Sequence, residues 1–182
     1  MKYTSLQQIF DDKERVFGTL KQIVVPLSSS QLSFRTAEGQ WTIAEIIEHL
    51  VLVESRLLKL VNVSSHRLEK TGTPGSTGSA LSIEIPYGTE RHDFFKVKTK
   101  EEYEPSGTVP CADSMTKLQT IHDDLFALRP RLEQIDLTAV SFDHWLFGTL
   151  SLGQWLAFIG VHQQRHLSQI RSILDSAQFP KK

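Results

Sequence analysis

The sequence has little cysteine and no long apolar run, and each shortage excludes a class of protein. Cys111 is the one cysteine in 182 residues, so an internal disulfide cannot form. The most apolar stretch, residues 43–53, carries Glu45, Glu48 and His49, whereas a bilayer-spanning helix needs about 20 mostly apolar residues. We therefore expect a soluble protein that folds around its own hydrophobic core and does not enter a membrane.

Neither sign of charge predominates, since 20 lysines and arginines face 21 aspartates and glutamates. A chain without a basic field does not attract nucleic acid or an anionic membrane, so we expect neither partner. Residues 1–5 lack the apolar core of a signal peptide, which predicts a cytoplasmic protein. The length fits one domain with a substantial core, and we expect residues 1–182 to form it.

Apolar residues recur with the period of an α-helix in four stretches, which are residues 5–25, a segment from 42, a segment from 113 or 114, and residues 151–176. Lys13 interrupts the apolar face of the first stretch, and we expect its ammonium group to reach water. Residues 71–112, rich in Gly, Pro, Ser and Thr, form a long irregular crossover, which predicts a lid. The aromatic segment 135–149 is expected to pack over one end. The pattern predicts an all-α fold, a four-helix bundle.

The helix expected at 151–176 carries His162 and His166 one turn apart inside its apolar arc. Ser151 and Gln154 have the spacing of a capping box at its start. A buried imidazole needs partners for both ring nitrogens, and a divalent metal ion can share two such lone pairs. The alternative is a pair of hydrogen-bonded core histidines, because this spacing alone does not establish a metal site.

A third ligand is offered by the helix expected from Thr42, where Glu45 completes another capping box. His49 lies at the edge of the apolar arc of that helix, facing inward. In a bundle, inward residues of two helices can converge, so His49, His162 and His166 could form a three-histidine site with open coordination positions. Such a site can acidify a water molecule or bind a thiol as thiolate.

Two familiar metal motifs do not fit the sequence. A zincin protease needs Glu directly after its first histidine, and this chain has Gln163 there. A ferritin-like di-iron bundle needs Glu-x-x-His pairs, and none of the seven histidines has Glu three residues before it. Both classes are therefore excluded.

Gln169 lies one turn after His166, and Glu45 lies one turn before His49. Either could orient an imidazole or a bound water, but neither is assigned as a catalytic residue, and the catalytic residues stay unknown. For Glu45 the alternative is a cap that only stabilises its helix.

The remaining histidines carry weaker signals. His66, His92 and His122 have no partner at an informative spacing and are predicted to be ordinary surface or loop residues. His144 has aromatic neighbours in the sequence. Its side chain has two alternative roles, packing in the core or lining a pocket. Cys111 is predicted to be an unactivated thiol.

Three segments resemble the DinB/YfiT-like superfamily of metalloenzymes: residues 41–50 (WTIAEIIEHL), 144–151 (HWLFGTLS) and 154–170 (QWLAFIGVHQQRHLSQI). One departure is Trp145, where many relatives have proline. The resemblance implies an up-down-down-up bundle and a metal ion held by three histidines, which correspond to His49, His162 and His166. It implies nickel or zinc first, with iron and manganese as alternatives, and a homodimer would suit the family.

The resemblance leaves several activities open. The superfamily includes S-transferases and isomerases that use low-molecular-weight thiols, proteins called metal-dependent hydrolases, and members without known activity. We favour a thiol-dependent S-transferase that acts on small electrophiles, with a small-molecule substrate and a low-molecular-weight thiol as partners. The alternatives are a metal-dependent hydrolase of a small ester or amide, and a metal-binding stress protein without turnover.

Overall fold

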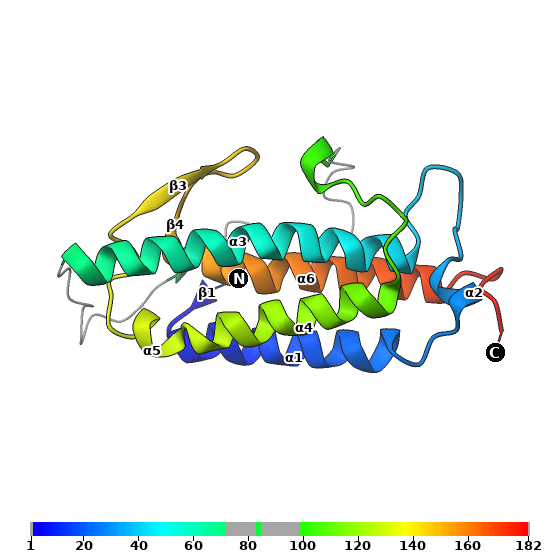
Figure 1. Cartoon of the computed structure of the whole chain (residues 1–182), viewed down its shortest axis with the longest axis horizontal. Helices are drawn as coiled ribbons and strands as arrows, with labels where there is room; N and C mark the ends of the chain where they lie inside the picture. Colours follow the sequence, from blue (N-terminus) through cyan, green and yellow to red (C-terminus); the bar gives the residue numbers. More distant parts are fainter. Residues whose placement is uncertain (1, 72–82, 85–98, 182) are drawn as a thin grey trace.

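The computed structural model describes residues 2–71, 83–84 and 99–181. Within these residues, four long helices form a bundle: α1 (Leu6–Val24), α3 (Ile43–Thr71), α4 (Cys111–Ala127) and α6 (Leu152–Leu174). In Figure 1, α1 and α6 run in one direction along the bundle, and α3 and α4 run in the other. This up-down-down-up order confirms the predicted all-α four-helix bundle.

The short elements lie at the ends of the bundle or above it. They are α2 (Ser29–Leu32), α5 (Arg129–Leu132) and the 3₁₀ helix η1 (Glu101–Tyr103). Strand β1 (Lys2–Tyr3) pairs antiparallel with β2 (Ile83–Glu84). No helix of the described ranges combines the length and the apolarity that crossing a membrane requires.

The helix starts follow from their capping residues. The Oγ1 of Thr42 accepts from the backbone N–H of Glu45 at 3.2 Å, and the Glu45 carboxylate accepts from the N–H of Thr42 at 2.7 Å. Ser151 and Gln154 form the same reciprocal pair at the start of α6, so both predicted capping boxes are confirmed. The predicted start of the third long helix at 113 or 114 is late, because α4 begins at Cys111, directly after Pro110.

The second half of the aromatic segment 135–149 belongs to a β-hairpin, residues 141–151, which the sequence pattern did not predict. Strand β3 (Ser141–His144) pairs antiparallel with β4 (Gly148–Ser151), and the turn ends at Gly148, whose φ of 71° favours glycine. The indole Nε1 of Trp155 donates to the carbonyl of Phe142 at 3.2 Å. This bond ties the hairpin to the first turn of α6, and the segment packs on the core as predicted.

A polar layer divides the hydrophobic core into two clusters. One cluster includes Phe10, Leu57 and Ile159, and the other includes Phe17, Leu50 and Leu167. Between them along the helices lie four buried polar side chains, one from each long helix: Lys13, Glu54, His122 and Gln163. The middle of the bundle is therefore held by polar contacts rather than by apolar packing alone.

Lys13 belongs to this layer, and the prediction that its ammonium group reaches water is wrong. The side chain is 3% exposed, and its Nζ donates to Glu54 Oε2 at 2.8 Å and to Gln163 Oε1 at 3.0 Å. A buried ammonium group needs such partners, because its desolvation is otherwise very costly. Both partners lie on other helices, where helical periodicity along α1 cannot reveal them.

The crossover between α3 and α4 is described in part. Residues 72–82 and 85–98 lie outside the described residues, and so do His92 and most of the predicted lid. From residue 99 the chain returns over α3 through η1 and reaches α4 at Cys111 (Figure 1). This last part of the crossover touches the candidate site.

Candidate metal site

The three histidines singled out in the sequence come together between α3 and α6. The Nε2 of His162 lies 3.4 Å from the Nε2 of His49 and 3.2 Å from the Nε2 of His166. All three potential ligand atoms lie within 4.8 Å of one another. Two residues one turn apart on α6 thus meet a third residue from the neighbouring helix, as the spacing predicted.

Hydrogen bonds on the outer side of the rings set where the protons lie. The Nδ1 of His49 donates to the backbone carbonyl of Tyr103 at 2.8 Å, and the Nδ1 of His166 donates to Gln169 Oε1 at 2.9 Å. A neutral imidazole has one N–H, so in both rings Nε2 carries a lone pair that faces the other histidines. The two rings are oriented as metal ligands would be.

Burial keeps these imidazoles neutral. Burial lowers the pKa of His49. Burial, and next the nearness of His49, lower the pKa of His166 to about 3. The pKa of His162 lies well below its usual range because of burial and the nearness of His166 and His49. Near pH 7 all three can therefore act as ligands, since metal binding requires the unprotonated nitrogen.

The donor set fits a divalent cation. Two metal–nitrogen bonds of about 2.0–2.1 Å at a tetrahedral angle place their nitrogens about 3.3 Å apart, close to the observed 3.4 and 3.2 Å. Lone pairs packed this closely repel one another unless a proton or a cation lies between them. Imidazole nitrogen suits zinc, nickel, iron and copper, so the ligands do not select one ion.

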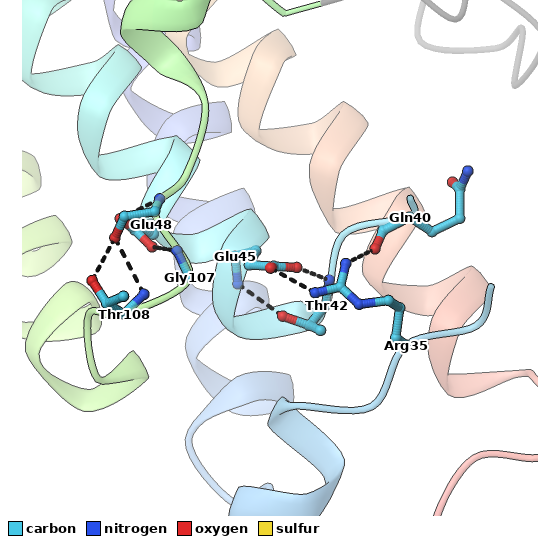
Figure 2. A network of polar contacts seen from close by, with 8 residues as sticks. Arg35, Gln40, Thr42, Glu45, Glu48, Gly107 and Thr108 are labelled. Carbon is cyan, nitrogen blue, oxygen red and sulfur yellow. Dashed lines mark hydrogen bonds and ion pairs between the residues drawn. The ribbon is translucent and has the colours of Figure 1, made fainter. Parts of the chain in front are cut away.

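Gln169 and Glu45, the two further candidates, differ in whether they contact a histidine of the site. Gln169 touches His166 through the bond described above. The Glu45 carboxylate instead accepts from the N–H of Thr42 and from Arg35 at 2.7 Å each, and Figure 2 shows this arrangement at the start of α3. The contacts of Glu45 are those of a cap, whereas Gln169 contacts the imidazole of His166 directly.

Several neighbours of the site were missed in the sequence. The ring of Trp41 lies 4.8 Å from that of His49, and the ring of Phe158 lies 5.5 Å from that of His162, measured between centroids. The Tyr103 contact uses a backbone carbonyl, which leaves no signature in a sequence. Trp41 precedes the Thr42 cap and Phe158 lies one turn before His162, so helical spacing could have placed both near the site.

His144 lies in an aromatic cluster rather than beside the three histidines. Its ring stacks on Phe147 at 4.4 Å and lies 5.1 Å from both Trp155 and Phe158. Its Nδ1 accepts the backbone N–H groups of Leu146 and Phe147. Burial and the charge of Lys100 lower its pKa to about 4. The packing interpretation of His144 accounts for these contacts.

The other predictions for single residues have mixed outcomes. His66 is exposed, as predicted. His122 is buried between Phe17 and Phe126 and bonds to Glu14 at 2.9 Å, so its prediction as a surface residue is wrong. Burial raises the pKa of the Cys111 thiol to about 11, which fits the predicted unactivated thiol.

Comparisons with known proteins identify the family of the chain and match its fold. The sequence profile of a family described as the DinB superfamily matches residues 14–170. The uncharacterized protein YuaE of Bacillus subtilis (strain 168) is 25% identical over 153 residues, which cover 84% of this chain and 88% of that protein. The solved structure of YfiT from Bacillus subtilis is described as a probable metal-dependent hydrolase with an unusual four-helix bundle topology. It matches with a TM-score of 0.59 at 19% identity, over 92% of this chain and 84% of that one.

Proposed function

The chain belongs to the DinB superfamily, and on that premise we propose that it is a metal-dependent hydrolase of a small ester or amide. His49, His162 and His166 hold the ion in this proposal. The observation that carries it is the convergence of their Nε2 atoms, with the Nδ1 atoms of His49 and His166 already occupied on the outer side.

The protein side chains contribute binding and orientation. Three neutral imidazoles add no negative charge, so the full charge of the ion remains available to polarise what binds next to it. A divalent ion held there would supply Lewis-acid chemistry, polarising a carbonyl group and lowering the pKa of a water molecule from about 15.7 to about 7. Tyr103 and Gln169 keep the rings of His49 and His166 oriented for that task.

Hydrolysis takes precedence over thiol transfer because of the structural neighbour. YfiT shares the bundle and is described as a probable metal-dependent hydrolase, and this supports the assignment of the same reaction class to this chain. From the sequence alone we favour an S-transferase because of the open three-histidine site, while the family resemblance leaves the activity open. The ion remains zinc or nickel first in this proposal, with iron and manganese as alternatives.

A thiol-dependent S-transferase is the second candidate. In the described part of the chain, no carboxylate forms a hydrogen bond or ion pair with the three imidazoles. Among the described residues, no carboxylate is thus fixed against the ligand imidazoles as a general base for water. A low-molecular-weight thiol needs none, because its pKa is already near 8.5 and falls further beside a cation. Its partner would be a small electrophile.

Measurement of both metal content and turnover on untagged protein distinguishes these functions. We expect stoichiometric metal, hydrolysis of activated p-nitrophenyl esters or anilides, and loss of both in His162→Ala. His66→Ala is the matched control, because His66 is exposed and remote in the bundle, and it should retain both. Thiol conjugation of model electrophiles without hydrolysis would favour the S-transferase. Full metal content with neither activity would favour a metal-binding protein without turnover, and metal content unaffected by the three His→Ala changes would refute the site.

A further inference from the structure

Glu48, the residue before His49, uses its carboxylate to hold the end of the crossover. Its Oε1 accepts from the backbone N–H of Ser106 at 2.9 Å and from the Ser106 hydroxyl at 2.7 Å. Its Oε2 accepts from the N–H of Gly107 at 3.0 Å. Figure 2 shows the carboxylate between α3 and this segment. The side chain is buried, so these three bonds replace the water that the charge has lost.

The segment is shaped to receive that carboxylate. Gly107 has a φ of 71°, the left-handed conformation that favours glycine, and a Cβ there would lie 3.1 Å from Glu45 Oε1. The two successive N–H groups of Ser106 and Gly107 converge on the anion, as they do in backbone anion-binding nests. Glu48 therefore fixes the position of this segment on α3 at the level of His49.

The same segment also carries the acceptor for His49. Tyr103, three residues before Ser106, accepts the Nδ1–H of His49 at 2.8 Å through its backbone carbonyl. Glu48 and His49 are adjacent on α3 and hold one short segment, residues 103–107, at its two ends. Movement of that segment would remove the Tyr103 carbonyl from His49.

We propose that Glu48 is a positioning residue for the metal site and acts on His49 through residues 103–107. An imidazole whose Nδ1 lacks an acceptor can carry its proton on Nε2, and a protonated Nε2 cannot bind a metal ion. By fixing the Tyr103 carbonyl, Glu48 keeps the proton of His49 on Nδ1 and leaves Nε2 free. The consequence for metal affinity rests on the proposed function, whereas the effect on the His49 proton does not.

The first test uses metal-free protein and Glu48→Gln, which keeps the shape of the side chain but cannot accept all three hydrogen bonds. Ring ¹⁵N chemical shifts of His49, assigned by comparison with His49→Ala, report which nitrogen carries the proton. We expect the Nδ1–H form in the unmodified protein and a detectable Nε2–H population in Glu48→Gln. The matched control is Asp136→Asn, since Asp136 holds another loop by accepting from the backbone N–H and hydroxyl of Thr138. It should leave His49 unchanged.

The second test measures Zn²⁺ affinity by competition with a chromophoric chelator. Loss of a group that orients a ligand typically costs 10–100-fold in metal affinity. We therefore expect an affinity about 10–100-fold weaker for Glu48→Gln and a smaller loss for Ser106→Ala, which removes one bond and serves if Glu48→Gln folds poorly. Asp136→Asn should bind Zn²⁺ as the unmodified protein does.

A double-variant cycle separates action through His49 from general loosening. If Glu48 acts through His49, Glu48→Gln causes no further loss of Zn²⁺ affinity in a His49→Ala background. An equal fold-loss in both backgrounds overturns the proposal, and so does an unchanged His49 proton in Glu48→Gln. If the unmodified protein binds no Zn²⁺ or Ni²⁺, the proposed function fails, while the ¹⁵N measurement still decides the role of Glu48.

Discussion

Replacement of Lys13 by Met tests whether the polar layer is held by charge pairing. In the folded protein the Lys13 and Glu54 side chains are 3% and 1% exposed, and their charged atoms are 2.8 Å apart. Lys13→Met leaves the Glu54 carboxylate in the core without a cation, and breaking a buried pair in this way costs about 3–5 kcal/mol. Burial already raises the pKa of Glu54, and Lys13 opposes that rise. In Lys13→Met this lowering effect of Lys13 on the pKa of Glu54 is absent.

The sign of the pH dependence follows from that pKa. A carboxyl group whose pKa is raised in the folded state is destabilising once pH exceeds its unfolded value of about 4.3. The stability lost in Lys13→Met should therefore be small near pH 4 and grow as pH rises toward 8. At neutral pH a loss of about 3 kcal/mol corresponds to roughly 6–12 °C in Tm for a chain of this size.

The double variant Lys13→Met/Glu54→Leu is the matched control. It removes both charges, and apolar replacement of a buried pair is often neutral or stabilising by about 1–4 kcal/mol. Urea unfolding at pH 5 and pH 8 should show that the double variant recovers most of the loss. A single variant that loses less than about 1 kcal/mol, or a double variant as unstable as the single one, would refute the explanation from buried charge.

Three further predictions concern other parts of the chain. Metal-free protein should lose stability as pH falls below about 6.5, because the histidine at position 166 takes up a proton in the unfolded chain but not in the folded one, where its pKa is about 3. Urea unfolding should show a loss of about 2 kcal/mol or more between pH 7 and pH 5. A stability that does not change over this range would contradict the low pKa of His166. Gly107→Ala should cost about 1–2 kcal/mol and more than Gly39→Ala, since both glycines have positive φ but only Gly107 has an atom close to the added Cβ; equal losses would argue against the close contact. Cys111, buried and with a pKa of about 11, should react with Ellman's reagent at pH 7.5 only at the rate of unfolding, and fast labelling of the native protein would disprove its burial.

The fold and the three histidines could be read from the sequence because local rules determine them. Two capping boxes mark the starts of α3 and α6, and helical periodicity places His162 and His166 on one face. His49 lies on the inward arc of the helix that Thr42 begins. In an α-helical bundle these inward faces converge, so the meeting of the three residues needs no knowledge of distant pairing.

The missed features depend on partners far apart in the chain. Lys13 and Glu54 are 41 residues apart, and Glu48 bonds to residues 58 and 59 positions later. His122 lies among rings from α1 and from its own helix. Apolar periodicity assigns each residue to a face, but it cannot say which polar group on another element meets it there. The polar layer and the Glu48 contacts therefore required the structure.

The order of α3 and α6 along the chain determines when the proposed metal site can form during synthesis. His49 leaves the ribosome more than one hundred residues before His162 and His166, which are separated from it by 113 and 117 positions. Domains generally fold as units while the chain grows from its N-terminus. The nascent chain can cap α3 early, but it cannot chelate an ion through all three imidazoles until α6 has emerged and docked. The three proposed ligands can therefore meet only after α6 has been synthesised, and a chain that stops before α6 would have only one of them.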